Sequence, residues 1–498
     1  MSFRAVLLEP ADASGSPHST WRGATPADRR HPIHDTSRGF SVPDTFTKRS
    51  RIAAPADEVF RWHERPGAFE RLAPPWQKIE VIERQGGIEP GGTVALRQSL
   101  GPLKITWRME HRDYIAGRQF RDCQLSGPFR SWTHTHTIEP NGPDDCYLRD
   151  QIEYALPAGA IGQRALGGFV GRQLERLFAY RHAVTAADLA DHRRFSGVNR
   201  MQIAIAGGSG LIGSALTPFL TTGGHQVRKL VRGRPATPDE IAWDPAAGKI
   251  DGARLAGCDA VVNLAGEGIA SRRWTKAQKE RIRSSRVEST ALLARTLAGL
   301  NPRPRVWVCA SAIGFYGDRG EERLDEASHA GEGFLPDVCR QWEAATAPAA
   351  DAGIRVVRLR FGVVLSPAGG ALAKMLPPFR MGVGGRLGDG RQYMSWIALD
   401  DVVGAIHHTL MHDTLAGAVN AVAPHPATNL EFTKTLGRVL HRPTIFPMPA
   451  AAARLAFGEM ADALLLASAR VYPARLLESG YAFRCPQLEA ALRHLLGK

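Results

Sequence analysis

Apolar runs alternate with amphipathic segments from residue 201 onward. Strands are expected at 201–206, 226–231, 260–264, 305–311 and 355–359, and segments of helical period lie between them. Strands that alternate with helices in this way are typical of a parallel sheet covered by helices on both faces. The pattern therefore predicts an α/β fold of the Rossmann type, with a doubly wound parallel sheet.

The chain before residue 190 has a different pattern. Short β-prone runs at 78–84, 93–98, 105–111 and 132–139 are separated by turn residues, as in an antiparallel sheet. An amphipathic helix is expected at 165–187, because one face of this segment is apolar. That face holds Leu166, Phe169, Val170, Leu174, Leu177 and Phe178. A meander of strands closed by one long helix predicts an α+β helix-grip domain at 44–190.

The remaining segments complete the expected domain order. Residues 1–43 are rich in Ser, Pro, Arg, His and Gly and have no sustained period, so a flexible tail is expected. Residues 191–200 are hydrophilic and are expected to link the helix-grip domain to a Rossmann domain at 201–428. Residues 429–498 carry apolar side chains at helical spacing and are expected to form a small C-terminal cap.

A glycine-rich turn separates the first strand of the predicted Rossmann domain from its first helix. Gly207, Gly210 and Gly213 repeat at every third position. In such a turn the first glycine permits a tight bend, the second lets the backbone approach a pyrophosphate, and the third lets helix and strand pack closely. The alternative is a plain glycine turn, which the strand and helix on either side disfavour. The residues expected to contact a dinucleotide are Gly207, Gly208, Ser209, Gly210, Leu211, Ile212 and Gly213.

The residues after the second strand of this domain bear on the choice of cofactor. An NAD site usually places an acidic residue there to hold the ribose hydroxyls. This chain has Arg232 and Arg234 instead, and no Asp or Glu before Asp239. A guanidinium binds phosphate through paired hydrogen bonds, so Arg232 favours the 2′-phosphate of NADP(H). The alternative is a solvated surface arginine.

Composition and charge narrow the classes of partner. Of the 498 residues 44% are hydrophobic and 22% are charged, which fits a globular protein with real cores. The net charge of +14 is dispersed, without a run of five like charges, so no nucleic-acid partner is expected. An uncharged apolar stretch of about 18 residues is lacking, so integral membrane association is not expected. The six scattered cysteines form no CxxC motif, so free thiols, a cytoplasmic location and no metal site are expected.

The first domain resembles the START and Bet v 1-like superfamily, also called SRPBCC. The matching residues are Ile52, Ala54-Pro55, Val59-Phe60, Trp62-His63, Pro66-Gly67-Ala68-Phe69 and Leu72-Ala73-Pro74-Pro75-Trp76. The resemblance implies a curved sheet that wraps the long helix and encloses an apolar cavity. Such a cavity would bind a lipid-like or aromatic ligand; the alternative is a cavity filled by its own side chains.

The second part of the chain resembles the atypical, epimerase-like branch of the extended short-chain dehydrogenases/reductases, in the NAD-dependent epimerase/dehydratase superfamily. The resemblance includes a C-terminal cap. It implies that Leu264 and Ala265 lie under the adenosine and ribose, Arg286 near the cofactor phosphates, and Val363 on the nicotinamide side. The matching segments are 262–267, 272–274, 285–286, 311–317, 342–343, 360–365, 384–385, 388–392, 396–397 and 400–401.

The chain departs from this family at its usual catalytic device, a hydroxyl residue with a Tyr-x-x-x-Lys pair. In that pair the lysine lowers the pKa of the tyrosine, so that the phenol can act as acid or base. At this spacing the helix offers Val338 with Trp342 or Cys339 with Glu343. Cys339 as a thiol acid or base, and Glu343 as a proton carrier, remain alternatives to buried packing.

The hydroxyl position of the family is Ala312 in this chain. Ser311 and Tyr316 are then the polar residues expected to face the nicotinamide. The alternative for Tyr316 is a structural tyrosine at the Tyr-Gly turn.

Together these features predict an atypical NADP(H)-dependent oxidoreductase or epimerase-like enzyme. Its substrate would be a small molecule of unidentified kind, and its fused helix-grip domain would bind a hydrophobic ligand. The alternatives are a non-catalytic NADP(H)-binding sensor, which the missing Tyr-x-x-x-Lys pair favours, and a ligand carrier with the Rossmann domain as its regulator.

Overall fold

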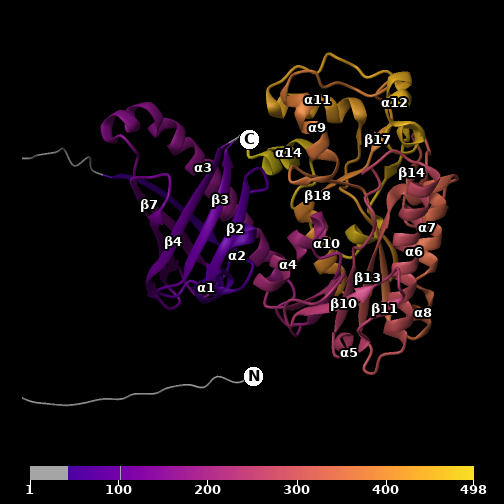
Figure 1. Ribbon diagram of the computed structural model, residues 1–498, viewed down its shortest axis with the longest axis horizontal. Helices are drawn as coiled ribbons and strands as arrows, with labels where there is room; N and C mark the ends of the chain where they lie inside the picture. Colours follow the sequence, from indigo (N-terminus) through magenta and orange to yellow (C-terminus); the bar gives the residue numbers. More distant parts are fainter. Residues whose placement is uncertain (1–42, 101–102) are drawn as a thin grey trace, which may run out of the picture. The chain divides into compact units, whose positions relative to one another are not determined.

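The computed structural model describes residues 43–100 and 103–498 (Figure 1). The tail predicted at 1–43 therefore lies outside the described residues, apart from its last position. Within the described part of the chain, no helix has both the length and the apolar character needed to cross a membrane.

Seven antiparallel strands form the sheet of the helix-grip domain, in the spatial order β1-β7-β6-β5-β4-β3-β2. Buried and half-buried positions alternate along the central strands, so one face of the sheet lies against a core. The strands are β1 (Asp44–Ile52), β2 (Lys78–Gln85), β3 (Thr93–Leu100), β4 (Leu103–Ile115), β5 (Gln119–Ser126), β6 (Ser131–Pro140) and β7 (Cys146–Ala155).

Three helices complete this domain: α1 (Ala56–Glu64), α2 (Ala68–Leu72) and the long α3 (Gly159–Arg193). The α3 helix extends beyond the predicted 165–187 at both ends. The first turns of α3 contain glycines, which lower helix propensity, so the sequence pattern placed the start of the helix too late.

The predicted apolar face of α3 is correct only in its second half. Leu174 and Phe178 are buried, whereas Leu166 and Phe169 are more than half exposed. The core cluster under the helix begins only at Val170, which packs near Trp132. Leu166 and Phe169 are therefore exposed because this part of α3 extends beyond the core.

The Rossmann domain is built on an eight-stranded sheet in the order β11-β10-β9-β8-β12-β13-β15-β19. All neighbouring strands are parallel except the β10–β11 hairpin. Most residues of the central strands are apolar and buried, because helices cover both faces of the sheet. The strands are β8 (Gln202–Ala206), β9 (Gln226–Val231), β10 (Glu240–Asp244), β11 (Lys249–Ile250), β12 (Ala260–Asn263), β13 (Val306–Ala312), β15 (Arg355–Phe361) and β19 (Gly417–Ala421).

The crossover helices of this sheet include α4 (Leu211–Thr222), α6 (Lys276–Ala298), α7 (Phe334–Ala344) and α10 (Leu399–Met411). The fold class predicted from the sequence, a doubly wound Rossmann sheet preceded by a helix-grip domain, is confirmed.

A second apolar cluster forms the cap over the Rossmann domain. The α11 helix begins with a capping box between Thr428 and Glu431, which satisfies its first backbone amides. The cluster also includes residues of α9 and β16, which precede residue 429. Its elements are β16 (Val363–Ser366), α9 (Gly370–Arg380), β18 (Trp396–Ala398), α11 (Asn429–Leu440) and α14 (Leu488–Leu496), and α12 (Ala450–Phe457) follows α11 in the chain.

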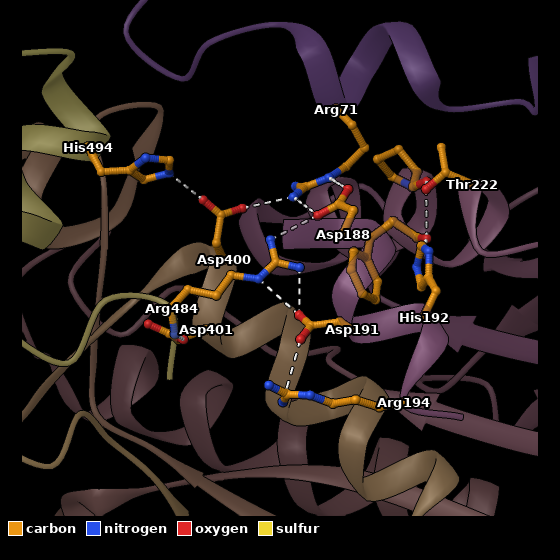
Figure 2. Close-up of polar contacts among 12 residues, drawn as sticks. Arg71, Asp188, Asp191, His192, Arg194, Thr222, Asp400, Asp401, Arg484 and His494 are labelled. Carbon is orange, nitrogen blue, oxygen red and sulfur yellow. Dashed lines mark hydrogen bonds and ion pairs between the residues drawn. The ribbon is translucent and has the colours of Figure 1, made fainter. Parts of the chain in front are cut away.

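A buried cluster of ion pairs joins α2 and α3 to the Rossmann domain and the cap (Figure 2). The Arg71 guanidinium donates two hydrogen bonds to Asp188, at 2.7 and 2.8 Å, and a third to Asp400 at 3.1 Å. Arg484 donates to Asp188 at 2.8 Å and to Asp191 at 2.6 Å. Burial opposes ionisation of Asp188, yet the two arginines outweigh that effect and lower the pKa of its carboxyl.

Candidate functional site

The glycine turn lies between β8 and the N-terminus of α4. Gly207 has a φ of 80°, and a Cβ at this position would lie 2.7 Å from the carbonyl carbon of Leu264. A Cβ at Gly213 would collide with the carbonyl oxygen of Gly207. Both positions therefore require glycine, and Ser209 and Gly210 between them are exposed. The turn presents bare backbone and a helix N-terminus, which together suit an anionic group.

The Leu264–Ala265 turn, predicted to lie under the adenosine and ribose, packs closely against Gly207. It is held by Asn263, whose side chain is completely buried. The Asn263 Oδ1 accepts a hydrogen bond of 3.2 Å from the Ala265 amide, and its Nδ2 donates to Thr290 Oγ1 at 3.1 Å. Asn263 thereby fixes the backbone of the turn beside the glycines.

Arg286 lies under the same loop. Its Nη2 donates to the Glu267 carbonyl at 2.9 Å, and its guanidinium carbon lies 5.2 Å from the centre of the Trp342 ring. Burial lowers the pKa of Arg286. In these hydrogen bonds the half-buried Arg286 guanidinium donates to backbone carbonyls and not to a carboxylate. Its positive charge is therefore available to an anion.

Two other predicted cofactor residues, Arg232 and Val363, lie at separate elements. Arg232 follows β9 and is exposed. Val363 begins β16, and its amide donates to the Ser395 carbonyl at 2.8 Å. A Cβ at Gly369 or Gly370, where the chain passes from β16 into α9, would lie 3.3 or 3.4 Å from the Leu211 side chain. The structure thus brings β16 beside the glycine turn.

Ser311 and Tyr316 belong to one buried polar network. The Ser311 hydroxyl donates to Glu343 Oε1 at 2.7 Å. Arg360 donates to both oxygens of Glu343, at 2.8 and 2.9 Å, and to the Tyr316 hydroxyl at 3.0 Å. The Tyr316 hydroxyl in turn lies 2.8 Å from Asn420 Oδ1.

Both predicted hydroxyls are enclosed: Tyr316 is 0% exposed and Ser311 is 2% exposed. Burial raises the pKa of Tyr316, and Arg360 only partly offsets that rise. The roles of Arg360 and Asn420 were not predicted from the sequence. Arg360 comes beside Ser311 through the pairing of β15 with β13, and Asn420 comes beside Arg360 through the pairing of β19 with β15.

The α7 helix turns Cys339 and Glu343 toward β13, rather than the pair Val338 and Trp342. The Cys339 thiol lies 3.8 Å from the Ala312 carbonyl. Burial, reinforced by the charge of Glu343, raises the pKa of Cys339 to about 12. A thiol of that pKa stays protonated near neutral pH, which argues against Cys339 as a general base.

Three protein-family profiles match the chain. The NAD dependent epimerase/dehydratase family matches residues 203–421, the polyketide cyclase/dehydrase and lipid transport family matches 52–182, and a domain of unknown function, DUF1731, matches 448–495.

Similar proteins carry the same family name. An epimerase family protein of Mycobacterium bovis is 47% identical over 290 residues, which are 58% of this chain and 96% of that protein. The human epimerase family protein SDR39U1 is 39% identical over 299 residues, 59% of this chain and 100% of that protein.

Two solved structures are also similar. A nucleoside-diphosphate sugar epimerase from Corynebacterium glutamicum is 35% identical, with a TM-score of 0.74, and the match covers 91% of this chain and 90% of that one. Human SDR39U1 (isoform 2), solved with NADPH, is 38% identical with a TM-score of 0.56, over 59% of this chain and 99% of that one.

Proposed function

The chain belongs to the NAD-dependent epimerase/dehydratase family, and we propose that its Rossmann domain binds NADP(H) and performs oxidoreductase or epimerase chemistry on a small molecule. The observation that carries the proposal is the glycine turn, where Gly207 and Gly213 leave no room for a Cβ and Ser209 and Gly210 are exposed before the N-terminus of α4. When bound, the cofactor supplies or accepts a hydride.

The residues present fit NADP(H). The amides at Gly207–Gly213 would bind the pyrophosphate at the start of α4. Leu264 and Ala265 would support the adenosine and ribose, Arg286 would approach the phosphates, and Val363 would flank the nicotinamide. Arg232 is exposed beside β9, where a 2′-phosphate needs a cation. The human relative was solved with NADPH, which supports the same cofactor here.

Ser311 and Tyr316 remain candidates for the catalytic centre, with a changed role. Both hydroxyls are held inside the network of Glu343 and Arg360. Their proposed contribution is to position that buried ion pair beneath the nicotinamide side, instead of donating a proton to substrate. This places them outside the usual role of the family's catalytic hydroxyls.

Calorimetric titration with NADPH and NADH tests the cofactor. We expect micromolar binding of NADPH and weaker binding of NADH. In Arg232→Ala the ratio of the NADH and NADPH dissociation constants should fall about tenfold, which corresponds to about 1.4 kcal/mol of lost charge-assisted hydrogen bonding. Arg234→Ala is the matched control, since Arg234 is also exposed after β9. Failure to bind either nucleotide overturns the proposal, and an unchanged preference in Arg232→Ala overturns the role of that residue.

A non-catalytic NADP(H) sensor is the second candidate, because Cys339 and Glu343 stand where the family has tyrosine and lysine. Steady-state oxidation of NADPH with a panel of aldehydes, ketones and quinones separates the two. Turnover of any member supports the enzyme. Tight NADPH binding with complete inactivity supports the sensor.

We also propose that the helix-grip domain binds a hydrophobic ligand, as its match to the polyketide cyclase and lipid transport family suggests. Aromatic side chains are concentrated in its core, where Trp107 and Trp132 lie 4.9 Å apart at their ring centres. Native mass spectrometry of protein purified from cells should show a co-purifying apolar molecule. An empty domain counts against this part of the proposal.

A further inference from the structure

A group of histidines and aspartates lies inside the helix-grip domain, apart from the nucleotide site. His134 and His136 alternate on β6 and therefore point to the same face of the sheet. Asp122 on β5 pairs in register with His134, and Asp150 on β7 pairs with His136. His134, His136 and Asp150 are each 5% exposed or less. Three neighbouring strands thus carry a buried cluster of metal-binding side chains.

The spacing of three atoms in this cluster is that of ligands around one metal ion. Asp122 Oδ2 lies 3.4 Å from His134 Nδ1 and 3.3 Å from His136 Nε2. Bonds of about 2.0–2.1 Å in a tetrahedral site place neighbouring ligand atoms roughly 3.3–3.4 Å apart. All three atoms lie within 4.8 Å of one another. An ion can therefore bridge them without rearrangement of the strands.

The far nitrogen of each imidazole faces a second carboxylate. Asp150 Oδ1 lies 2.9 Å from His134 Nε2 and 2.6 Å from His136 Nδ1. The His134 contact is an aligned hydrogen bond, whereas the His136 nitrogen is close but not aligned in the described structure. Histidines that bind metals characteristically turn their second nitrogen to a carboxylate, which orients the ring.

Each of the two aspartates also contacts a further histidine. Its Oδ1 lies 2.8 Å from His111 Nε2, and Asp150 Oδ2 lies 2.5 Å from His182 Nε2. Two carboxylates in this interior need compensating positive charge, because an uncompensated buried charge is costly. A divalent cation supplies that charge while the ligating imidazoles stay neutral.

We propose that the helix-grip domain binds one divalent transition-metal ion through His134 Nδ1, His136 Nε2 and Asp122 Oδ2. Two imidazoles and one carboxylate suit Zn²⁺ or Fe²⁺, and three protein ligands leave coordination positions for water or an oxygen atom of a ligand. Phe120 stacks on His136 with ring centres 4.1 Å apart, and Phe178 lies 5.1 Å from the His134 ring.

No metal site was expected, because the chain has no CxxC motif and no histidine pairs at the spacing of known zinc sites. The sequence signal for the proposed site is His134-x-His136 on a strand. The third ligand comes from another strand, through a pairing that sequence spacing does not reveal.

The test uses the full-length chain, stripped of metal with a chelator and titrated with Co²⁺. We expect one equivalent to bind with a visible d–d absorption spectrum and an X-ray absorption signature of imidazole ligands. His134→Gln and Asp122→Asn should weaken binding at least about 100-fold, beyond the 10- to 100-fold typical of changes to residues behind the ligands. The exposed His329→Gln and His425→Gln are controls that should leave binding unchanged.

Two results overturn the proposal. One is a wild-type chain that binds no stoichiometric Co²⁺, in which case the cluster is compensated by protons alone. The other is Co²⁺ binding that survives both ligand substitutions in variants with wild-type circular dichroism and NADPH binding. The spectra of the wild type decide the matter even where a variant fails to fold.

Discussion

Glu343 of α7 forms a buried ion pair with Arg360 of β15 and also accepts a hydrogen bond from the Ser311 hydroxyl. Each partner is less than 10% exposed at its side chain. Glu343→Gln should lower the free energy of unfolding by about 3–5 kcal/mol, because it leaves the Arg360 charge buried without its counter-charge. Urea denaturation followed by circular dichroism measures the loss.

The double variant Glu343→Gln/Arg360→Met is the control for this prediction. It removes both charges, so it should be more stable than the single variant Glu343→Gln. Losses that simply add across the two substitutions would contradict a coupled pair. If Tyr316 depends on Arg360 for its place, its hydroxyl should also become more accessible in the double variant.

Cys339 offers a second test at the scale of one residue. Because burial raises the pKa of this thiol to about 12, its thiolate is scarce at pH 8. Iodoacetamide should alkylate the partly exposed Cys123 in the native protein and leave Cys339 unmodified until urea is added. Peptide mass spectrometry measures both sites in one sample. Equal rates at Cys339 and Cys123 would restore the thiol acid/base alternative.

Three elements of the fold meet at a group of buried histidines: His192 at the end of α3, His225 before β9 and His407 in α10. The ring centres of His192 and His225 lie 5.6 and 5.7 Å from that of His407. Burial lowers the pKa of His192 to about 3 and of His225 to about 4, and holds that of His407 well below its usual value. The folded chain therefore keeps these rings neutral.

This group predicts how stability depends on pH. Below about pH 6.5 these three histidines bind protons in the unfolded chain but stay neutral in the folded chain. The free energy of unfolding therefore falls as the pH falls. The slope should reach about 1.4 kcal/mol per pH unit for each histidine between pH 6.5 and 5. Urea titrations at several pH values measure it, and His407→Gln should reduce the slope by one histidine's share. A slope unchanged by His407→Gln would contradict the assignment.

At the scale of elements, local signals were predictable and distant pairings were not. The glycine turn was predictable because Gly207, Gly210 and Gly213 lie within seven residues between a strand and a helix. Asn420 meets Tyr316 across 104 positions, through the pairing of β19 with β15, and no spacing in the sequence records that contact. The proposed metal site escaped notice for the same reason, since Asp122 and His134 meet only through strand register.

At the scale of the whole molecule, the cooperativity of unfolding depends on the contacts between the helix-grip domain and the Rossmann domain. Residues 43–498 form one compact unit, and the ion-pair cluster around Asp188 lies where α2 and α3 meet α10 (Figure 2). Arg484 of the cap segment binds Asp188 and Asp191 of α3, and its backbone amide donates to Asp401 of α10 at 2.6 Å, so it connects three parts of the chain. A buried arginine with two carboxylate partners should contribute more to this connection than any exposed pair.

Arg484→Met should therefore separate the unfolding of the two domains. In scanning calorimetry we expect one cooperative transition in the wild type and two in the variant, because the variant removes the arginine that ties the cap segment to Asp188 and Asp191. NADPH should raise the temperature of only one of the two transitions, since a ligand stabilises the unit that binds it. Arg493→Met, which removes an exposed pair with Glu489, is the control and should change stability by less than about 1 kcal/mol. A single transition in Arg484→Met that NADPH shifts as a whole would mean that apolar packing, and not the ion-pair cluster, holds the domains together.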